Sequence, residues 1–138
     1  MTVDGHELPV LTLAYIGDAV FELWVRTYLL EKGLVRADDL HRAVVRLVQA
    51  KGQADLIKRL LPDLDEDERA VFRRGRNAKG QHPRHADVLE YRYATGLETL
   101  IGYLHISDQE RMAALFAKIE YVLEAVDIIS DKEYLTSK

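Results

Sequence analysis

The stretch LAYIGDAVFELWV, residues 13–25, decides the fold of this chain. Between Leu8 and Leu30 the charged residues are Asp18, Glu22 and Arg26. Their spacing of four places them in one narrow stripe along an α-helix. The other positions are almost all apolar or small, so we expect a helix with protein packed around nearly all of its sides.

Asp18 is the residue of this stretch that calls for a chemical explanation. An acid in an apolar helix needs a base, a hydrogen-bond donor or a metal as its partner. The preceding Gly17 costs roughly 1 kcal/mol of helix propensity relative to alanine, which indicates a close approach to the backbone. We interpret Asp18 as a metal ligand, and the structural alternative is an acid paired with Arg26 or with the N-terminus of a neighbouring helix. Glu22 orients a ligand or forms a salt bridge to Arg26, and both readings stay open.

The composition is that of one globular domain spanning 1–138, in which we expect 1–7 and 127–138 to be flexible. The absence of cysteine excludes disulfides and thiolate metal sites. No apolar run approaches the roughly 20 residues of a membrane span, and the N-terminus has no basic region followed by an apolar core. We therefore expect a cytoplasmic protein without a membrane partner.

The first half of the chain predicts two long helical regions. The first begins near Leu8 and ends at Glu31 or Lys32, before a glycine. The second runs from about Ala37 to Leu61, with Gly52 as a candidate break.

The second half predicts three more helices, each opened by a polar cap. Asp65, with Glu68 three residues on, opens a short helix, and Asp87 begins the next. Ser107 and Glu110 form a second capping-box pattern, which predicts the start of the last helix. No strand pattern is present, so the predicted fold is all-α with five to six or more helices.

A basic tract interrupts an otherwise acidic chain of net charge −4. Residues 73–85, RRGRNAKGQHPRH, read as a loop, and no acid occurs between Arg69 and Ala86. A solvated loop is the ordinary explanation, but a run of bases without an acid favours contact with phosphates. The candidate phosphate-contacting residues are Arg73, Arg74, Arg76, Asn77, Lys79 and Arg84. For the first two, packing against the following helix is the alternative.

A second isolated acid occurs late in the chain. Glu98 is the only charged residue between Tyr93 and Leu104. If its helix crosses the first one, Asp18 and Glu98 form an oxygen-ligand pair suited to Mg²⁺.

Three motifs in this order carry a resemblance to a known family. GDAVFEL (17–23), RGRNAK (74–79) and YRYATGLETLIG (91–102) resemble ribonuclease III catalytic domains, and most closely the Mini-ribonuclease III branch. The resemblance implies that Asp18 and Glu98 are catalytic metal ligands and that Tyr15 lies at a dimer interface. Larger relatives carry two further acids where this chain has Ala14 and Thr95, so the resemblance also implies a leaner metal site.

The resemblance implies an enzyme with a defined reaction. It implies an all-α homodimer that hydrolyses double-stranded RNA with Mg²⁺, or Mn²⁺ in its place, leaving 5′-phosphate and 3′-hydroxyl ends. The implied substrate is precursor 23S ribosomal RNA, with a large-subunit ribosomal protein as a further candidate partner. The alternative is a non-catalytic helical module that binds RNA or the ribosome, and a plain helical interaction domain is the third reading. Neither alternative explains two isolated acids in apolar helices.

Overall fold

Helices make up all of the regular structure in the part of the chain that the computed structural model describes, residues 3–80, 82, 84 and 87–126. They are η1 (Gly5–Glu7), α1 (Val10–Glu31), α2 (Ala37–Val48), α3 (Ala50–Leu60), η2 (Leu61–Asp63), α4 (Glu66–Arg76), α5 (Val88–Ser107) and α6 (Gln109–Val126). The prediction of an all-α fold is therefore confirmed for this part of the chain. Among these helices, none has both the length and the apolar character that a bilayer crossing requires.

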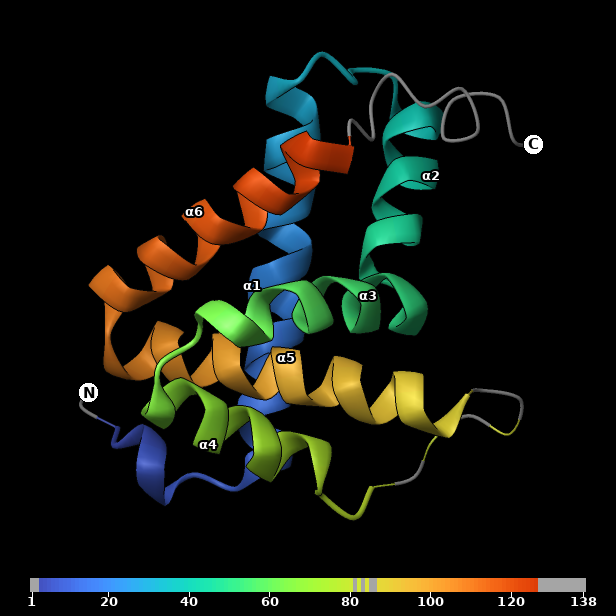
Figure 1. Ribbon diagram of the computed structural model, residues 1–138. Coiled ribbons are helices and arrows are strands. Elements are labelled where there is room, and N and C mark those ends of the chain that lie inside the picture. The colour runs from blue at the N-terminus through green and yellow to red at the C-terminus, as the bar shows by residue number, and fades with distance from the viewer. Residues whose placement is uncertain (1–2, 81, 83, 85–86, 127–138) are drawn as a thin grey trace.

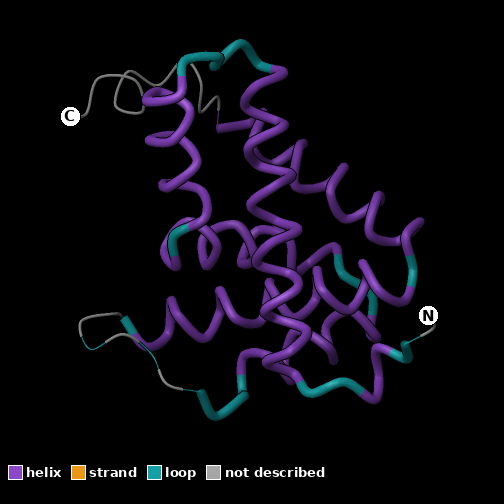
Figure 2. The backbone as a smooth tube through the Cα atoms, turned by 180° about the vertical axis from the view of Figure 1, so that it is seen from behind, coloured by secondary structure: helices purple, strands orange, loops and turns teal. Residues whose placement is uncertain are grey.

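The crossing of α1 and α5 organises the other helices. α5 passes across α1 in Figure 1, and the view from behind in Figure 2 shows α1 running through the middle of the molecule. A Cβ atom on Gly17 would lie 1.7 Å from the carbonyl oxygen of Glu98, and one on Gly102 would lie 1.9 Å from that of Leu13. The two helices therefore touch backbone to backbone, which only glycine allows.

The core is built around this crossing. α1 contributes fully buried leucine, phenylalanine and valine side chains, and α5 meets them with a buried run of its own. Each fully buried side chain of this size contributes roughly 1.5–3 kcal/mol to folding. The core residues of the two helices include Leu13, Phe21, Val25 and Leu29 of α1 and Leu97, Leu100, Ile101 and Leu104 of α5.

One face of α1 departs from the prediction of protein on nearly all sides. Leu11, Tyr15, Leu23 and Leu30 are between 48% and 79% exposed in the single chain. Their spacing places them along one side of α1, and we call these four residues the α1 stripe. Within a single chain the prediction of protein on nearly all sides of α1 is therefore wrong, because no other element of the described structure covers this side.

The break between the second and third helices lies earlier than predicted. α2 ends at Val48 and α3 begins at Ala50, so the chain turns at Gln49 and not at Gly52. Gly52 has a different role, since a Cβ atom there would lie 2.2 Å from the carbonyl oxygen of Arg46. The glycine lets the first turn of α3 fold back closely on the end of α2.

The predicted capping box at Ser107 is also wrong, although the helix it predicted exists. Ser107 is the last residue of α5, and Asp108 interrupts the helix with an extended backbone. Its carboxylate accepts a hydrogen bond from the backbone N–H of Arg111 at 3.1 Å. An aspartate therefore caps α6, in a position where a negative charge also favours the helix N-terminus.

α4, the helix that begins after Asp65, is longer than predicted. The capping box of Asp65 and Glu68 is confirmed, but α4 continues to Arg76, so the loop begins at Asn77. Close packing explains the extension, because a Cβ atom on Gly75 would lie 2.4 Å from the hydroxyl oxygen of Thr99 on α5. Arg73, Arg74 and Arg76, which were predicted to lie in a loop, thus occupy the C-terminal turns of α4, where cations are favourable.

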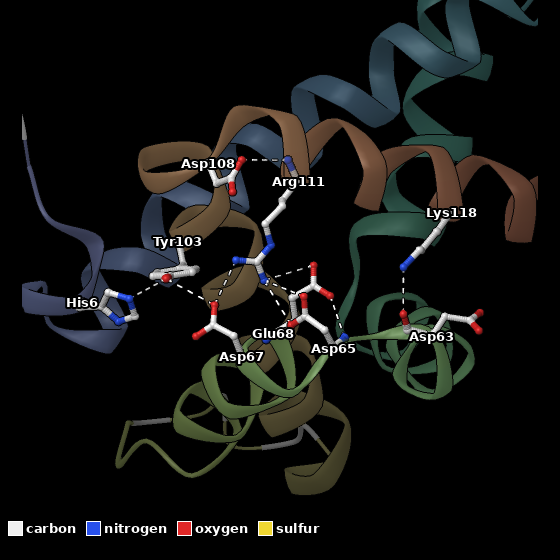
Figure 3. Close-up of polar contacts among 9 residues, drawn as sticks. All are labelled: His6, Asp63, Asp65, Asp67, Glu68, Tyr103, Asp108, Arg111 and Lys118. Atoms are coloured by element: carbon white, nitrogen blue, oxygen red, sulfur yellow. Dashed lines mark hydrogen bonds and ion pairs between the residues drawn. The ribbon is translucent and has the colours of Figure 1, made fainter.

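An ion-pair cluster fixes α6 to the start of α4. Figure 3 shows Arg111 at the start of α6 reaching the acidic residues of α4. Its guanidinium nitrogens lie 3.2 Å from Asp65, 3.1 Å from Asp67 and 3.6 Å from Glu68. Tyr103, near the C-terminal end of α5, contacts the same Asp67.

The glycine contact predicts a severe packing defect in Gly17→Ala. We expect this variant to lose about 3 kcal/mol or more of unfolding free energy, because the new methyl group has no space beside the α5 backbone. Gly80→Ala is the matched control, since a Cβ atom there would lie 3.6 Å from the nearest side-chain atom, an ordinary contact. Urea denaturation of both variants checks the prediction, and equal stability of the two would contradict it.

Candidate active site

The structure brings the two isolated acids together. Gly17 touches the α5 backbone at Glu98, so the next residue, Asp18, extends beside the Glu98 side chain. The two carboxyl groups lie within hydrogen-bonding reach of each other. Residues eighty positions apart in the sequence therefore form one pair, although their predicted metal-binding and catalytic roles stay predictions.

This pair opens into a small hollow of about 190 Å³. We call it the acidic hollow, and its lining residues come from α1 and α5: Leu11, Ala14, Tyr15, Asp18, Tyr91, Thr95 and Glu98. Asp18 is exposed and Glu98 is half-buried, so a ligand can reach both carboxyl groups from solvent.

Burial and the neighbouring acid make Glu98 an unusual carboxyl group. Loss of hydration raises the pKa of Glu98 most strongly, and the hydrogen bond and the negative charge of Asp18 raise it further, to about 8. A hydrogen bond from Gln53 acts in the opposite direction. At neutral pH the pair therefore holds a proton that a divalent cation could replace.

Gln53 is a site residue that the sequence analysis missed. It lies on α3, is 2% exposed, and donates from its side-chain nitrogen to Glu98 at 3.3 Å. The available signal was a polar residue in helical register with the buried Leu56, Ile57 and Leu60. That signal shows burial, but it does not reveal the partner.

Among the described residues, two carboxylates line the acidic hollow. Ala14 and Thr95, the positions of extra acids in larger relatives, both line it, and the Thr95 hydroxyl donates to the Tyr91 carbonyl at 2.9 Å. Within the described residues there is no group of three or more histidine, cysteine, aspartate or glutamate side chains that could enclose a metal. Mg²⁺ fits this donor set, because it commonly uses one or two carboxylates together with water and substrate phosphates.

The structure favours the ordinary reading of Glu22. Its carboxylate lies 2.9 Å from the guanidinium of Arg26, and both side chains are largely exposed. Glu22 does not line the acidic hollow. The salt bridge predicted as one alternative is therefore present.

A larger groove of about 640 Å³ continues from the acidic hollow and shares Leu11, Tyr91 and Thr95 with it. We call it the basic groove. Its other lining residues come from the end of α4, the following loop and the start of α5: Gly75, Asn77, Ala78, Lys79, Gly80, His82 and Arg92.

The predicted RNA-binding residues divide into two groups. Asn77 and Lys79 line the basic groove, and Arg76 lines a neighbouring depression together with Asn77. The remaining three predicted residues, Arg73, Arg74 and Arg84, are exposed and line neither space.

Arg92 is a second residue that the sequence analysis missed. It lies on α5, is exposed, and lines both the basic groove and the neighbouring depression. α5, which carries Glu98, thus also presents a positively charged side chain toward the loop that follows α4. Sequence reasoning overlooked it because Arg92 lies beyond the acid-free tract.

The comparisons with known proteins agree with this geometry. The model of the Ribonuclease III domain matches residues 11–109, which include both acids and the basic groove. The fold and the site therefore define a ribonuclease III-type endoribonuclease.

Similarity to individual proteins narrows this class. The chain is 50% identical over 116 residues to the Mini-ribonuclease 3 of Desulfitobacterium hafniense, covering 83% of this chain and 74% of the relative. It is 54% identical over 108 residues to the Mini-ribonuclease 3 of Symbiobacterium thermophilum, covering 77% and 83%. The chain belongs to the Mini-ribonuclease 3 family. This confirms the prediction of an enzyme over the non-catalytic alternatives.

A solved structure supports the fold. A crystal structure of a protein from Fusobacterium nucleatum aligns with a TM-score of 0.77 and 33% sequence identity. The alignment covers 90% of this chain and 98% of that one. The similarity therefore extends over nearly the whole domain.

The acid pair predicts a pH-dependent stability. Because the pKa of Glu98 is raised from 4.5 to about 8, the folded protein binds more protons than the unfolded chain between these values. The free energy of unfolding should fall as pH rises through this window, by at most about 1.4 kcal/mol per pH unit. Glu98→Gln should remove this slope, and added Mg²⁺ should reduce it in the unsubstituted protein. Urea denaturation across the pH range measures both, and superimposable profiles for the two proteins would contradict the prediction.

Proposed function

We propose that this chain cleaves double-stranded RNA as a Mg²⁺-dependent homodimer, with Mn²⁺ able to substitute, and that it matures 23S ribosomal RNA precursors in the bacterial cytoplasm. The observation that carries the proposal is the continuity of the acidic hollow with the basic groove. A polyanion held in the groove would bring a phosphate to the acid pair.

Asp18 and Glu98 are the residues that would hold the cation. When bound there, a divalent cation supplies Lewis acidity, which activates water for attack and offsets the charge that develops on the phosphate. In the overall reaction the water oxygen forms a bond to phosphorus, the bond to the 3′ oxygen breaks, and that oxygen takes up a proton. The products are the predicted 5′-phosphate and 3′-hydroxyl ends.

The basic groove supports recognition of the RNA backbone. Lys79 and Arg92 supply positive charge, and Asn77 supplies an amide that donates hydrogen bonds. The deep major groove of A-form RNA hides the base edges, so a duplex is recognised mainly through phosphates and 2′-hydroxyl groups. This chemistry matches the side chains in the groove.

The α1 stripe supports the homodimer. It exposes large apolar side chains on the helix that carries Asp18, and Tyr15, its most exposed member at 79%, also lines the acidic hollow. Covering such a stripe with a second copy would remove apolar surface from water. Two sites in one dimer would cleave the two strands of a duplex.

Removing either acid tests the catalytic proposal. Asp18→Asn and Glu98→Gln should each reduce cleavage of a structured RNA in Mg²⁺ by at least about 100-fold, because each removes one of two carboxylate ligands. Binding of the same RNA should persist in both variants. Glu22→Gln is the control, because Glu22 pairs with Arg26 away from the acidic hollow. This variant should cleave the RNA as fast as the unsubstituted protein. Full cleavage by both acid variants would overturn the proposal.

Removing groove cations tests the RNA contact. Arg92→Ala and Lys79→Ala should weaken duplex binding at moderate salt, and each should reduce the slope of log affinity against log salt by about 1. Lys32→Ala is the control, because Lys32 pairs with Glu124 at the far end of α1. Salt slopes equal to that of the unsubstituted protein in both groove variants would show that the groove does not contact phosphates.

A further inference from the structure

We propose that Gln53 is a positioning residue, which holds the Glu98 carboxylate in the orientation that a divalent cation requires. The inference rests on the proposed function, since it takes Asp18 and Glu98 as the cation ligands. Gln53 itself does not reach the acidic hollow. Its effect would therefore pass through Glu98.

The first observation is the pair of hydrogen bonds from one buried nitrogen. The side-chain nitrogen of Gln53 donates to the carbonyl oxygen of Val48 at 2.7 Å and to the Glu98 carboxylate at 3.3 Å. Val48 is the last residue of α2, and Gln53 lies in the first turns of α3. One amide thus links the α2–α3 corner to the acid on α5.

The second observation determines the orientation of this amide. The Val48 carbonyl oxygen can only accept, so the nitrogen must face it, and an exchange of nitrogen and oxygen would lose this hydrogen bond and bring two oxygens together. The side-chain oxygen of Gln53 is then buried and has no hydrogen-bond partner among the described residues. An unpaired buried acceptor destabilises the folded protein, so the two hydrogen bonds of the nitrogen are made at the expense of the oxygen.

The third observation is the rigidity of the corner from which Gln53 extends. A Cβ atom on Gly52 would meet the α2 carbonyl oxygens at 2.2 Å and 2.8 Å, so the backbone beside Gln53 is held against α2. With α3 packed on α5 as well, the amide has little freedom to follow Glu98. The carboxylate must adapt to the amide, which is the arrangement expected of a group that orients a ligand.

The residue type also fits this role. An amide donates a hydrogen bond without carrying charge, so it orients the carboxylate but does not neutralise it. A lysine in this position would compete with the cation, and a glutamate would present oxygen to two acceptors. Outer-shell partners of metal ligands commonly change metal affinity by 10–100-fold when they are removed.

Gln53→Met tests the inference, because methionine has a similar length and no hydrogen-bond donor. Binding of Mn²⁺ to the RNA-free protein, measured from the signal of free Mn²⁺ in electron paramagnetic resonance, should weaken by roughly tenfold. Duplex RNA binding without divalent cations should not change. Leu56→Ala is the control, since it creates a cavity in the same buried face of α3 without touching Glu98. Mn²⁺ affinity should stay within about twofold in this control.

A folded Gln53→Met protein with unchanged Mn²⁺ affinity would overturn the inference, and so would an equal loss in Leu56→Ala. Nuclear magnetic resonance of the unsubstituted protein provides a test that needs no variant. Titration with Mg²⁺ should shift the side-chain amide signals of Gln53 and leave those of Gln109, which bonds to the His105 carbonyl, unchanged. The inference would also be contradicted if the side-chain amide signals of Gln53 did not respond while the backbone amide signals of Asp18 and Glu98 shifted.

These outcomes are separable from the proposed function. If the unsubstituted protein bound Mn²⁺ but failed to cleave duplex RNA, the proposed function would fail while the effect of Gln53 on affinity was still measured. If it cleaved RNA and Gln53→Met bound Mn²⁺ normally, only the positioning role would fail.

Discussion

The contact between the backbones of α1 and α5 is the constraint on which the rest of the structure depends. At Gly17 and at Gly102 a single added methyl group would clash with the backbone of the other helix. Glycine at these two positions therefore lets α1 and α5 come into direct contact. This contact determines where Asp18 stands relative to Glu98. The same contact that packs the core therefore creates the electrostatic problem of two adjacent acids. Burial beside Asp18 raises the pKa of Glu98, and a cation is the natural counterpart of such a pair.

Much of the fold and the acid pair could be predicted from the sequence because each produced a local pattern. Asp18 and Glu98 were conspicuous as single charges within apolar helices, and the cap at Asp65 followed from its own spacing with Glu68. The resemblance to ribonuclease III then gave these residues a role. The helix breaks were less predictable, since the turn at Gln49 and the cap at Asp108 depend on which of several adjacent polar residues packing selects.

The residues that escaped prediction act between elements. Gln53 reads as an ordinary polar residue until α3 is placed against α5, and Arg92 reads as a surface charge until the loop after α4 lies beside it. The exposed α1 stripe was predicted only at Tyr15, which the resemblance placed at a dimer interface, because an apolar pattern does not say whether its cover belongs to the same chain. Tertiary placement decided each of these cases. The periodicity of the sequence alone could not reveal these contacts between elements.

The replacement of two potential acids by Ala14 and Thr95 has a consequence for how ligands assemble at the site. With two carboxylates available, most of the coordination sphere of a cation is left to water and to phosphate oxygens. On the proposed function, such an ion would be held loosely until a nucleic acid completes its surroundings. By thermodynamic reciprocity, whatever factor the RNA adds to the affinity for the ion, the ion adds to the affinity for the RNA. On the proposed function, a sparse ligand set would thus make assembly cooperative, so that the bound ion strengthens the binding of the duplex and the bound duplex strengthens the binding of the ion.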